Sequence, residues 1–145
     1  MNNLNINVLF CENYNCNTNS AMHTFDEVNI NYMKLNKADI LLLVNSIKNT
    51  GYHIKAILSK ENEKVVDLFE FDFKEKENIS NDQFFINSEK FLLTLDIDKL
   101  RQNGTGDYYL SVLAHPINSD NKKEKEYNIS DMELITFSKL RVKHK

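Results

Sequence analysis

Two cysteines and a histidine near the N-terminus are of the residue types that bind zinc, which prefers thiolates and imidazoles. Four residues separate Cys11 from Cys16, and His23 follows seven positions later. No second cysteine pair follows, and the other three histidines are scattered along the chain. The spacing therefore favours two free thiols over a zinc site, with Cys11 at a strand end and Cys16 in a loop. A nucleophilic cysteine needs a nearby base, and the sequence does not place His23, His53 or His115 beside either thiol.

A second group of possible metal ligands lies between residues 96 and 107. Oxygen ligands of the kind that calcium prefers are carried by Asp96, Asp98, Asn103 and Asp107. Their spacing lacks the twelve-residue loop signature of a calcium site. We expect Asp96 to point outward from a strand and Asp98 to cap the following turn. Asn103 and Gly104 are expected to supply a positive φ, so the sequence predicts no metal and no cofactor.

Tyrosines are the residues that could bind a carbohydrate, because an aromatic ring offers a flat apolar face with a polar tip. The candidates are Tyr14, Tyr32, Tyr52, Tyr109 and Tyr127. Tryptophan is absent from the chain, which counts against a sugar site. A carbohydrate-binding module stays open as the alternative function.

Composition excludes several other classes of function. The 145 residues are 41% hydrophobic and 27% charged, an ordinary globular balance. The net charge of −3 provides no basic field to hold nucleic acid. With only three glycines, the chain cannot build a glycine-rich phosphate loop. Asparagine, present 21 times, is expected to replace glycine in many turns.

The sequence also carries expectations about cellular location. The N-terminus has no basic leader, and the longest apolar run, Ile40 to Val44, is far short of a membrane span. Two cysteines without an export signal are typical of a reducing compartment. We therefore expect a protein without membrane contacts that is cytoplasmic or associated with a virion.

The elements that would position these residues are mostly strands. Phe69, Phe71 and Phe73 alternate with Glu70 and Asp72, which is the period of a strand and not of a helix. This segment follows another alternating run across a polar turn, so residues 52–73 are predicted to form a hairpin. Similar alternation predicts strands at 4–10, 84–97, 108–115 and 132–142, with one or two short strands at 22–32.

Three segments need separate interpretation. Residues 36–51 fit either a helix capped by Asn36 or a strand, and the continuous apolar run favours the strand. The Asn-rich segment 12–20 is predicted to be a loop. Near the C-terminus, an edge strand kept soluble by its charges is predicted from the alternating residues Lys139, Arg141, Lys143 and Lys145. The chain is thus predicted to be all-β, a single domain (1–145) folded as an antiparallel β-sandwich of seven to nine strands with at most one short helix.

The segment Leu93 to Ala114 resembles the corner between two strands of immunoglobulin-like and C2-like β-sandwiches. Alternating apolar residues lead to an apolar plug at Leu100, and Gly106 and Tyr108 open the next strand. The resemblance implies that Tyr108 packs against the sheet and sends its hydroxyl to a backbone group of the preceding turn. Leu110 stands where antibody-type domains have a cysteine, so the chain is not of that type.

These observations favour architecture over catalysis. The sequence contains many strands and no converging catalytic set. We expect a non-catalytic sandwich from a bacterium or its phage that binds a protein partner or assembles into a particle.

Overall fold

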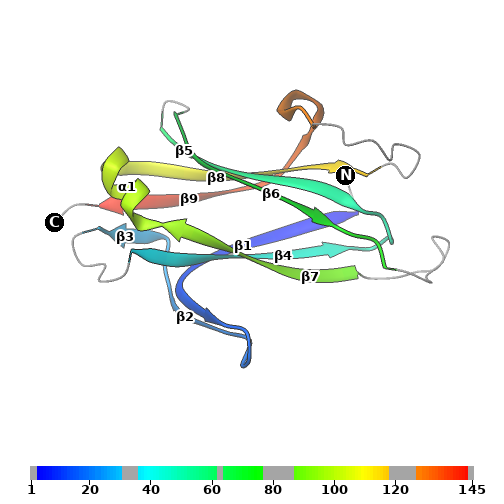
Figure 1. Cartoon of the computed structure of the whole chain (residues 1–145), viewed down its shortest axis with the longest axis horizontal. Helices are drawn as coiled ribbons and strands as arrows, with labels where there is room; N and C mark the ends of the chain where they lie inside the picture. The colour runs from blue at the N-terminus through cyan, green and yellow to red at the C-terminus, as the bar shows by residue number, and fades with distance from the viewer. Residues whose placement is uncertain (1–2, 31–35, 62–63, 77–86, 118–126, 144–145) are drawn as a thin grey trace.

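The computed structural model describes residues 3–30, 36–61, 64–76, 87–117 and 127–143. Within these ranges the chain forms nine β-strands, one α-helix and one short 3-10 helix. The strands make two sheets that pack face to face (Figure 1). The prediction of an all-β sandwich with at most one short α-helix is confirmed.

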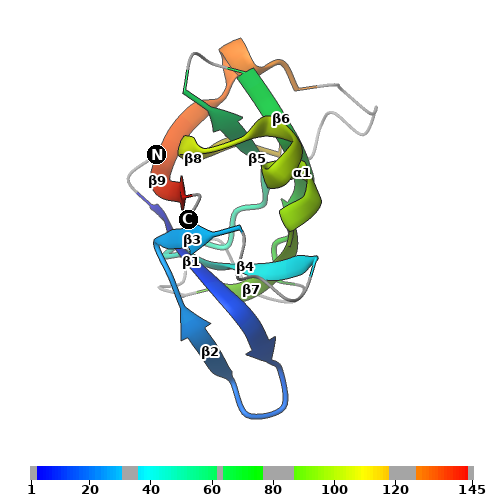
Figure 2. The ribbon, with the colours of Figure 1, turned by 90° about the vertical axis from the view of Figure 1, so that its left-hand side faces the viewer.

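Sheet A has four strands, in the spatial order β2-β1-β4-β7. The strands are β1 (Leu4–Asn15), β2 (Ser20–Thr24), β4 (Lys37–Ser46) and β7 (Asn87–Asp96). All three pairings are antiparallel. The distal part of β1 and all of β2 form a hairpin that projects from the side of sheet A away from sheet B (Figure 2).

Sheet B has five strands, in the order β3-β9-β8-β5-β6. The strands are β3 (Glu27–Asn29), β5 (Tyr52–Lys60), β6 (Lys64–Phe73), β8 (Gly106–Pro116) and β9 (Glu133–Lys143). The helix α1 (Ile97–Asn103) connects β7 of sheet A to β8 of sheet B, and the 3-10 helix η1 (Ile129–Asp131) precedes β9.

Alternating apolar residues from both sheets build the core between them. Ile40 and Leu42 of sheet A and Ile54 and Leu110 of sheet B have no solvent exposure. Because successive side chains of a strand point to opposite faces, each strand sends every second residue into this core. The predicted hairpin is confirmed by the antiparallel pairing of β5 with β6.

The ambiguous segment 36–51 forms β4, so the strand interpretation is confirmed. Its apolar run has Ile40 and Leu42 in the core, while Leu41 is buried on the opposite face. Burial on both faces explains why the run lacks the alternation of a half-buried strand. The predicted short strands at 22–32 appear as β2 and β3, and Tyr32 lies outside the described residues.

The prediction for segment 12–20 is wrong over its first part. The first strand does not end near Phe10 but continues to Asn15. Cys11 and Tyr14 are buried in this extension, where they pack with Leu41. Cys11 is therefore an interior strand residue, and only residues 16–19 separate β1 from β2.

The C-terminal strand is a second correction. Lys139, Arg141 and Lys143 do alternate outward from the buried Leu140 and Val142. However, β9 is not an edge strand at this end, because β3 pairs with its last three residues. This pairing is parallel, so the sandwich is not wholly antiparallel. Lys145 lies outside the described residues.

Asparagine contributes to turns more through its side chain than through a positive φ. Asn15 Oδ1 accepts hydrogen bonds from the backbone N–H groups of Asn17 and Thr18 at 2.9 and 3.3 Å, which closes the β1–β2 turn. Asn19 has a φ of 53° in the same turn. Asn103 is not among the residues of positive φ, and Gly104, with a φ of 85°, supplies that conformation alone.

Candidate functional site

The corner between sheets A and B holds the three residues that the sequence resemblance selected. Leu100 and Tyr108 have no solvent exposure. The Tyr108 hydroxyl donates to the carbonyl oxygen of Gly104 at 2.6 Å and lies 3.3 Å from that of Leu100. Burial raises the pKa of Tyr108, so the hydroxyl remains a donor. Gly106 has a φ of 139°, which side chains other than hydrogen rarely allow.

The connection before this corner differs from the predicted short turn, because it is the helix α1. Asp96, not Asp98, is the N-cap: its side chain accepts hydrogen bonds from the N–H groups of Asp98 and Lys99. Asp98 instead pairs with Arg101 at 2.8 Å. Asp107 lies 3.3 Å from both Lys139 and Arg141. These four candidate oxygen ligands thus take part in capping, ion pairing and a helix-end contact, in which Asn103 Nδ2 donates to Lys99 O at 2.7 Å.

The two thiols of the zinc alternative lie in different surroundings. Cys11 is buried, and Cys16 is exposed in the β1–β2 turn. Burial and the nearby Asp39 carboxylate raise the pKa of the Cys11 thiol, which disfavours a reactive thiolate. Among the residues that the structure describes, no group of three or more His, Cys, Asp or Glu side chains is placed to hold a metal ion.

The candidate sugar-binding tyrosines are mostly covered. Tyr14 and Tyr52 are buried. Tyr127 stacks on His53 at 4.6 Å between ring centroids and lies 5.1 Å from His115. Tyr109 is half-buried on the outer face of sheet B, where its ring packs 5.6 Å from Phe137. The described tyrosines therefore do not form a shared aromatic platform.

The outer face of sheet B carries a group of exposed apolar side chains that sequence reasoning did not select. In one cross-strand row, Leu68 opposes Ile57, and Phe137 opposes Ser111. In the next row, Leu134 opposes Leu113. We call this group the outer apolar face and define it by the residues Val65, Leu68, Tyr109, Leu134 and Phe137.

Exposure distinguishes these side chains from ordinary strand residues. Phe137 is 58% exposed and Leu134 is 56% exposed, although both lie within the strand β9. Val65 and Leu68 of β6 are similarly exposed on the same face, at the edge of sheet B away from β9. Single exposed apolar residues are common, but several gathered on one face mark interaction sites. The only signal in the sequence was the interruption of strand alternation at these positions.

A segment of the chain covers the middle of this face. Tyr127 and Met132, which flank η1, pack against Ile57 and Leu113, and this contact forms a small apolar cluster apart from the main core. Lys55 Nζ donates to the Tyr127 carbonyl oxygen at 2.6 Å, which ties the segment to β5. The outer apolar face therefore lies on both sides of a short ridge.

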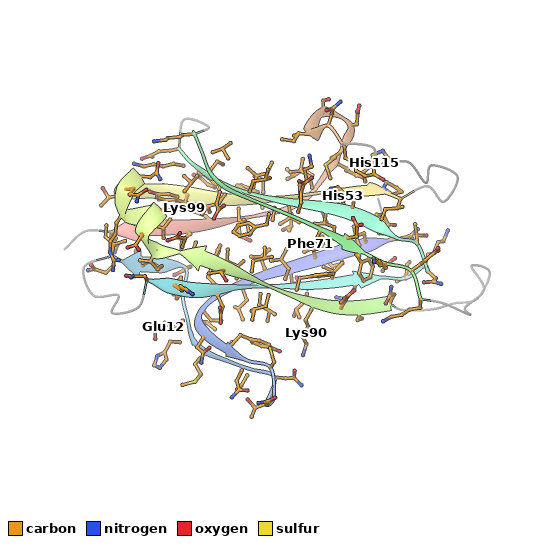
Figure 3. All side chains as sticks on the ribbon, viewed as in Figure 1. Glu12, His53, Phe71, Lys90, Lys99 and His115 are labelled. Atoms are coloured by element: carbon orange, nitrogen blue, oxygen red, sulfur yellow. The ribbon has the colours of Figure 1, made fainter. Side chains whose placement is uncertain are left out.

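Charged groups border the face at its two ends. At one end, His53 Nδ1 lies 2.6 Å from Asp72 Oδ1, and His53 Nε2 lies 3.0 Å from Glu70 Oε1. Figure 3 shows His53 and His115 on the upper side of the sandwich, where β5 begins and β8 ends. The hydrogen bond from His53 lowers the pKa of Glu70. At the other end, Asp107 lies between Lys139 and Arg141.

Two shallow hollows lie beside this second charged group. They have volumes of about 230 and 390 Å³, and Arg141 borders both. Acidic and basic side chains line them together, so neither has the single sign of charge that would select a charged ligand. No helix of the described residues has the length and apolar character needed to cross a membrane.

Comparisons with known proteins bear on the fold. No protein-family model matches the chain, and no curated protein matches it. A bacterial adhesin from Mobiluncus mulieris, whose structure contains intramolecular disulfide, isopeptide and ester bond cross-links, is similar with a TM-score of 0.52 and 10% identity. The alignment covers 99% of this chain and 58% of that chain. A second crystal form of that adhesin aligns with a TM-score of 0.48 and 10% identity, over 91% of this chain and 48% of that chain.

This chain therefore spans less than two thirds of the adhesin chain that it matches. At such low identity, the likeness concerns the fold alone. It is compatible with a β-sandwich of the immunoglobulin-like kind.

Proposed function

We propose that the chain is a non-catalytic protein-interaction module that binds its partner through the outer apolar face of sheet B. The observation that carries the proposal is the exposure of Leu134 and Phe137 on the outer face of sheet B, where the Phe137 ring packs against Tyr109. The outer apolar face has the composition of a protein interface, with an apolar centre that includes aromatic residues and a polar rim. The charged groups around His53 and Asp107 would form that rim.

Protein is a better ligand for this surface than carbohydrate. A sugar site needs an open ring face, but His53 stacks on Tyr127, and Tyr109 packs against Phe137. Aliphatic side chains such as Leu68 and Leu134 complement apolar side chains of a protein partner. The likeness to the adhesin concerns the fold and is compatible with a protein-binding role. The proposal does not depend on that likeness.

We propose a non-catalytic role because of where the possible nucleophiles and bases lie. The thiol of Cys11 is buried in β1 and has a raised pKa, and Cys16 lies in an exposed turn. The ionisable residues around His53 pair with each other on an open sheet surface. The two free thiols also support a location in a reducing compartment.

A matched pair of double variants tests the proposal. The immobilised wild-type chain is used to capture proteins from a bacterial host lysate, and mass spectrometry quantifies what is retained. Leu134→Ser with Phe137→Ser should reduce the retained partner on the order of tenfold or more. The control, Leu9→Ser with Met22→Ser, removes two exposed apolar side chains from the sheet A side and should retain the partner. Equal losses in both variants would contradict the proposal.

A further inference from the structure

The free edges of the two sheets differ in how well they are protected against pairing with another strand. Among the described residues, the end strands are β2 and β7 in sheet A, and β3 and β6 in sheet B. β2 and β3 are short, with five and three residues. The register of β6 shifts beside Ser59, which is a bulge of the kind that disrupts edge pairing.

β7 lacks these protections. Its ten residues pair with β4 without a register shift, so the strand presents a long and regular edge. The middle of the strand is the apolar triplet Phe91, Leu92 and Leu93. A lysine is a common guard of such an edge, but Lys90 is directed elsewhere. Its Nζ lies 2.9 Å from Asn19 Oδ1 and 5.9 Å from the centre of the Tyr14 ring, both in the β1–β2 hairpin.

Figure 3 shows Lys90 on the side of the sandwich from which this hairpin projects. The positive charge is therefore held over the outer face of sheet A. A strand that approaches β7 in the plane of the sheet would therefore reach the β7 backbone without having to move the Lys90 side chain.

The hydrogen-bond pattern shows which backbone groups face the open edge. The Ile97 N–H donates to Asn36 O at 2.9 Å and continues the register in which Asp96 opposes Lys37. In an antiparallel ladder, successive residues direct their N–H and C=O groups to opposite sides. The odd-numbered residues of β7 therefore bond to β4. Pointing away from β4 are the N–H and C=O groups of Ser88, Lys90, Leu92 and Thr94.

We infer that β7 pairs antiparallel with β7 of a second copy of this chain, across a two-fold axis that passes through Leu92. On the outer face of sheet A, Leu9 opposes Leu41, and Leu41 opposes Leu92, so a row of leucines ends at the open edge. The two-fold axis places Leu92 opposite its own copy. The leucine row then continues without interruption through both molecules.

The same register matches the remaining side chains. On the inner face, Phe91 of one copy lies opposite Leu93 of the other. On the outer face, Lys90 lies opposite Thr94 and diagonal to Asp96 of the second copy, an attractive arrangement of opposite charges. No two like charges are directly opposed in this register. A self-complementary strand of this kind is what a two-fold interface requires.

Charges on the neighbouring edge strand do not oppose the approach. β6 lies next to β7 across the core, where the Phe71 and Phe91 ring centroids are 4.3 Å apart. Its acidic residues are paired within their own copy. Asp67 lies 3.1 Å from Lys99, and Glu70 lies 3.3 Å from Lys55.

Cysteine cross-linking at β7 tests the axis directly. In the full chain carrying Cys16→Ser, Leu92→Cys should form a disulfide-linked dimer under mild oxidation, because directly opposed residues in such a pair have Cα atoms about 5.5 Å apart. Ser88→Cys is the matched control on the same edge. Its two copies would be about 27 Å apart in this register and should not cross-link, from a rise of about 3.4 Å per residue. Equal cross-linking at both positions would overturn the inference.

Sedimentation velocity of the unmodified chain provides an independent readout. We expect a monomer–dimer equilibrium that Leu92→Lys weakens on the order of tenfold or more, since it places two positive charges on the axis. Leu9→Lys, at the far end of the leucine row, should leave the dimer intact. A wild-type chain that is monomeric up to about 1 mM, or a dimer that survives Leu92→Lys, would overturn the inference.

The inference is independent of the proposed partner surface. Leu134→Ser with Phe137→Ser should leave Leu92→Cys cross-linking unchanged, while Leu92→Lys should leave partner capture unchanged. If the outer apolar face itself joined two copies, the first double variant would abolish the dimer and Leu92→Cys would not cross-link more than Ser88→Cys. Each of the two surfaces can thus fail separately.

Discussion

The outer faces of sheets A and B both carry apolar residues, but the chain covers them unequally. On sheet A, the central Leu41 is 4% exposed because Cys11 and Tyr14 of the hairpin region pack with it. On sheet B, residues near η1 cover only the middle of the face, and Leu134 and Phe137 remain more than half exposed.

This difference separates apolar residues that stabilise the fold from apolar residues that are available to a partner. Burying a leucine or phenylalanine side chain is worth about 1.5–3 kcal/mol. On sheet A, the hairpin obtains that stabilisation at Leu41 within the chain. On sheet B, the corresponding free energy at Leu134 and Phe137 can be gained only when another molecule covers them.

The largest expected effect comes from truncating matched leucines on the two faces. Leu41→Ala should lower the free energy of unfolding by about 2–4 kcal/mol, because it leaves a cavity beneath the hairpin. Leu134→Ala should change it by no more than about 0.5 kcal/mol, since the side chain is mostly in water. Urea unfolding followed by circular dichroism measures both. Similar losses in the two variants would mean that the faces are not covered differently.

Cysteine labelling can sharpen the comparison, because each thiol reports on one environment of the hairpin. Cys16 should react with a maleimide at the rate of a free thiol. Cys11 should react at least about 100-fold more slowly, since the hairpin must open first and burial also raises the thiol pKa. Mass spectrometry after timed quenching gives the two rates. Comparable rates in the folded protein would show that the hairpin does not cover sheet A in solution.

The Tyr108 corner provides a reference that belongs to neither outer face. Tyr108→Phe removes the hydroxyl that donates to Gly104 O and should lower the free energy of unfolding by about 1–2 kcal/mol. Partner capture through Phe137 should remain at the wild-type level once the protein is kept below its unfolding temperature. A loss of capture without a loss of stability would assign the corner a role in binding.

The smallest effect concerns the charged border of the outer apolar face. The folded-state pKa of Glu70 is lowered from its ordinary value of 4.5, chiefly by the hydrogen bond from His53. As the pH falls below the ordinary value, the unfolded chain binds the proton first. Glu70 therefore contributes stability above pH 4.5 that is lost as the pH falls through its folded-state pKa.

Glu70→Gln should accordingly make the decline in stability below pH 4.5 shallower than in the wild type. His53→Phe should produce a similar change, and the double variant should add little to either single variant, as expected for two partners of one interaction. Chemical unfolding at a series of acidic pH values measures the slopes. Fully additive effects would show that the two side chains do not interact in solution.

Local patterns predicted the strands better than they predicted the faces. The alternation of Phe69, Glu70 and Phe71 indicated a strand because only one of its faces meets the core. In contrast, Leu41 and Leu43 lie on a face that only the distant hairpin covers, so the local pattern could not distinguish this second face from the core. The length of β1 was missed for the same reason, since Tyr14 is buried by a tertiary contact.

The candidate interaction surface was beyond prediction because it depends on register. Leu134 and Ile135 are neighbours in sequence, yet the irregularity opposite Val112 and Leu113 leaves Leu134 exposed while Ile135 packs on the core. Nothing in the residue types separates the two. The Tyr108 corner, whose contacts lie within eight residues along the chain, was accessible to sequence reasoning.

Hydroxyl-radical footprinting of the protein with its captured partner tests the central claim most directly. The measurement compares oxidation rates in the free and bound chain at Tyr109, Leu134 and Phe137 on sheet B, and at Met22 and Leu92 on the sheet A side. We predict a several-fold fall in oxidation at the three sheet B residues and no change at the other two. Protection of Met22 or Leu92 with Leu134 and Phe137 unchanged would contradict the assignment of the interaction surface to sheet B.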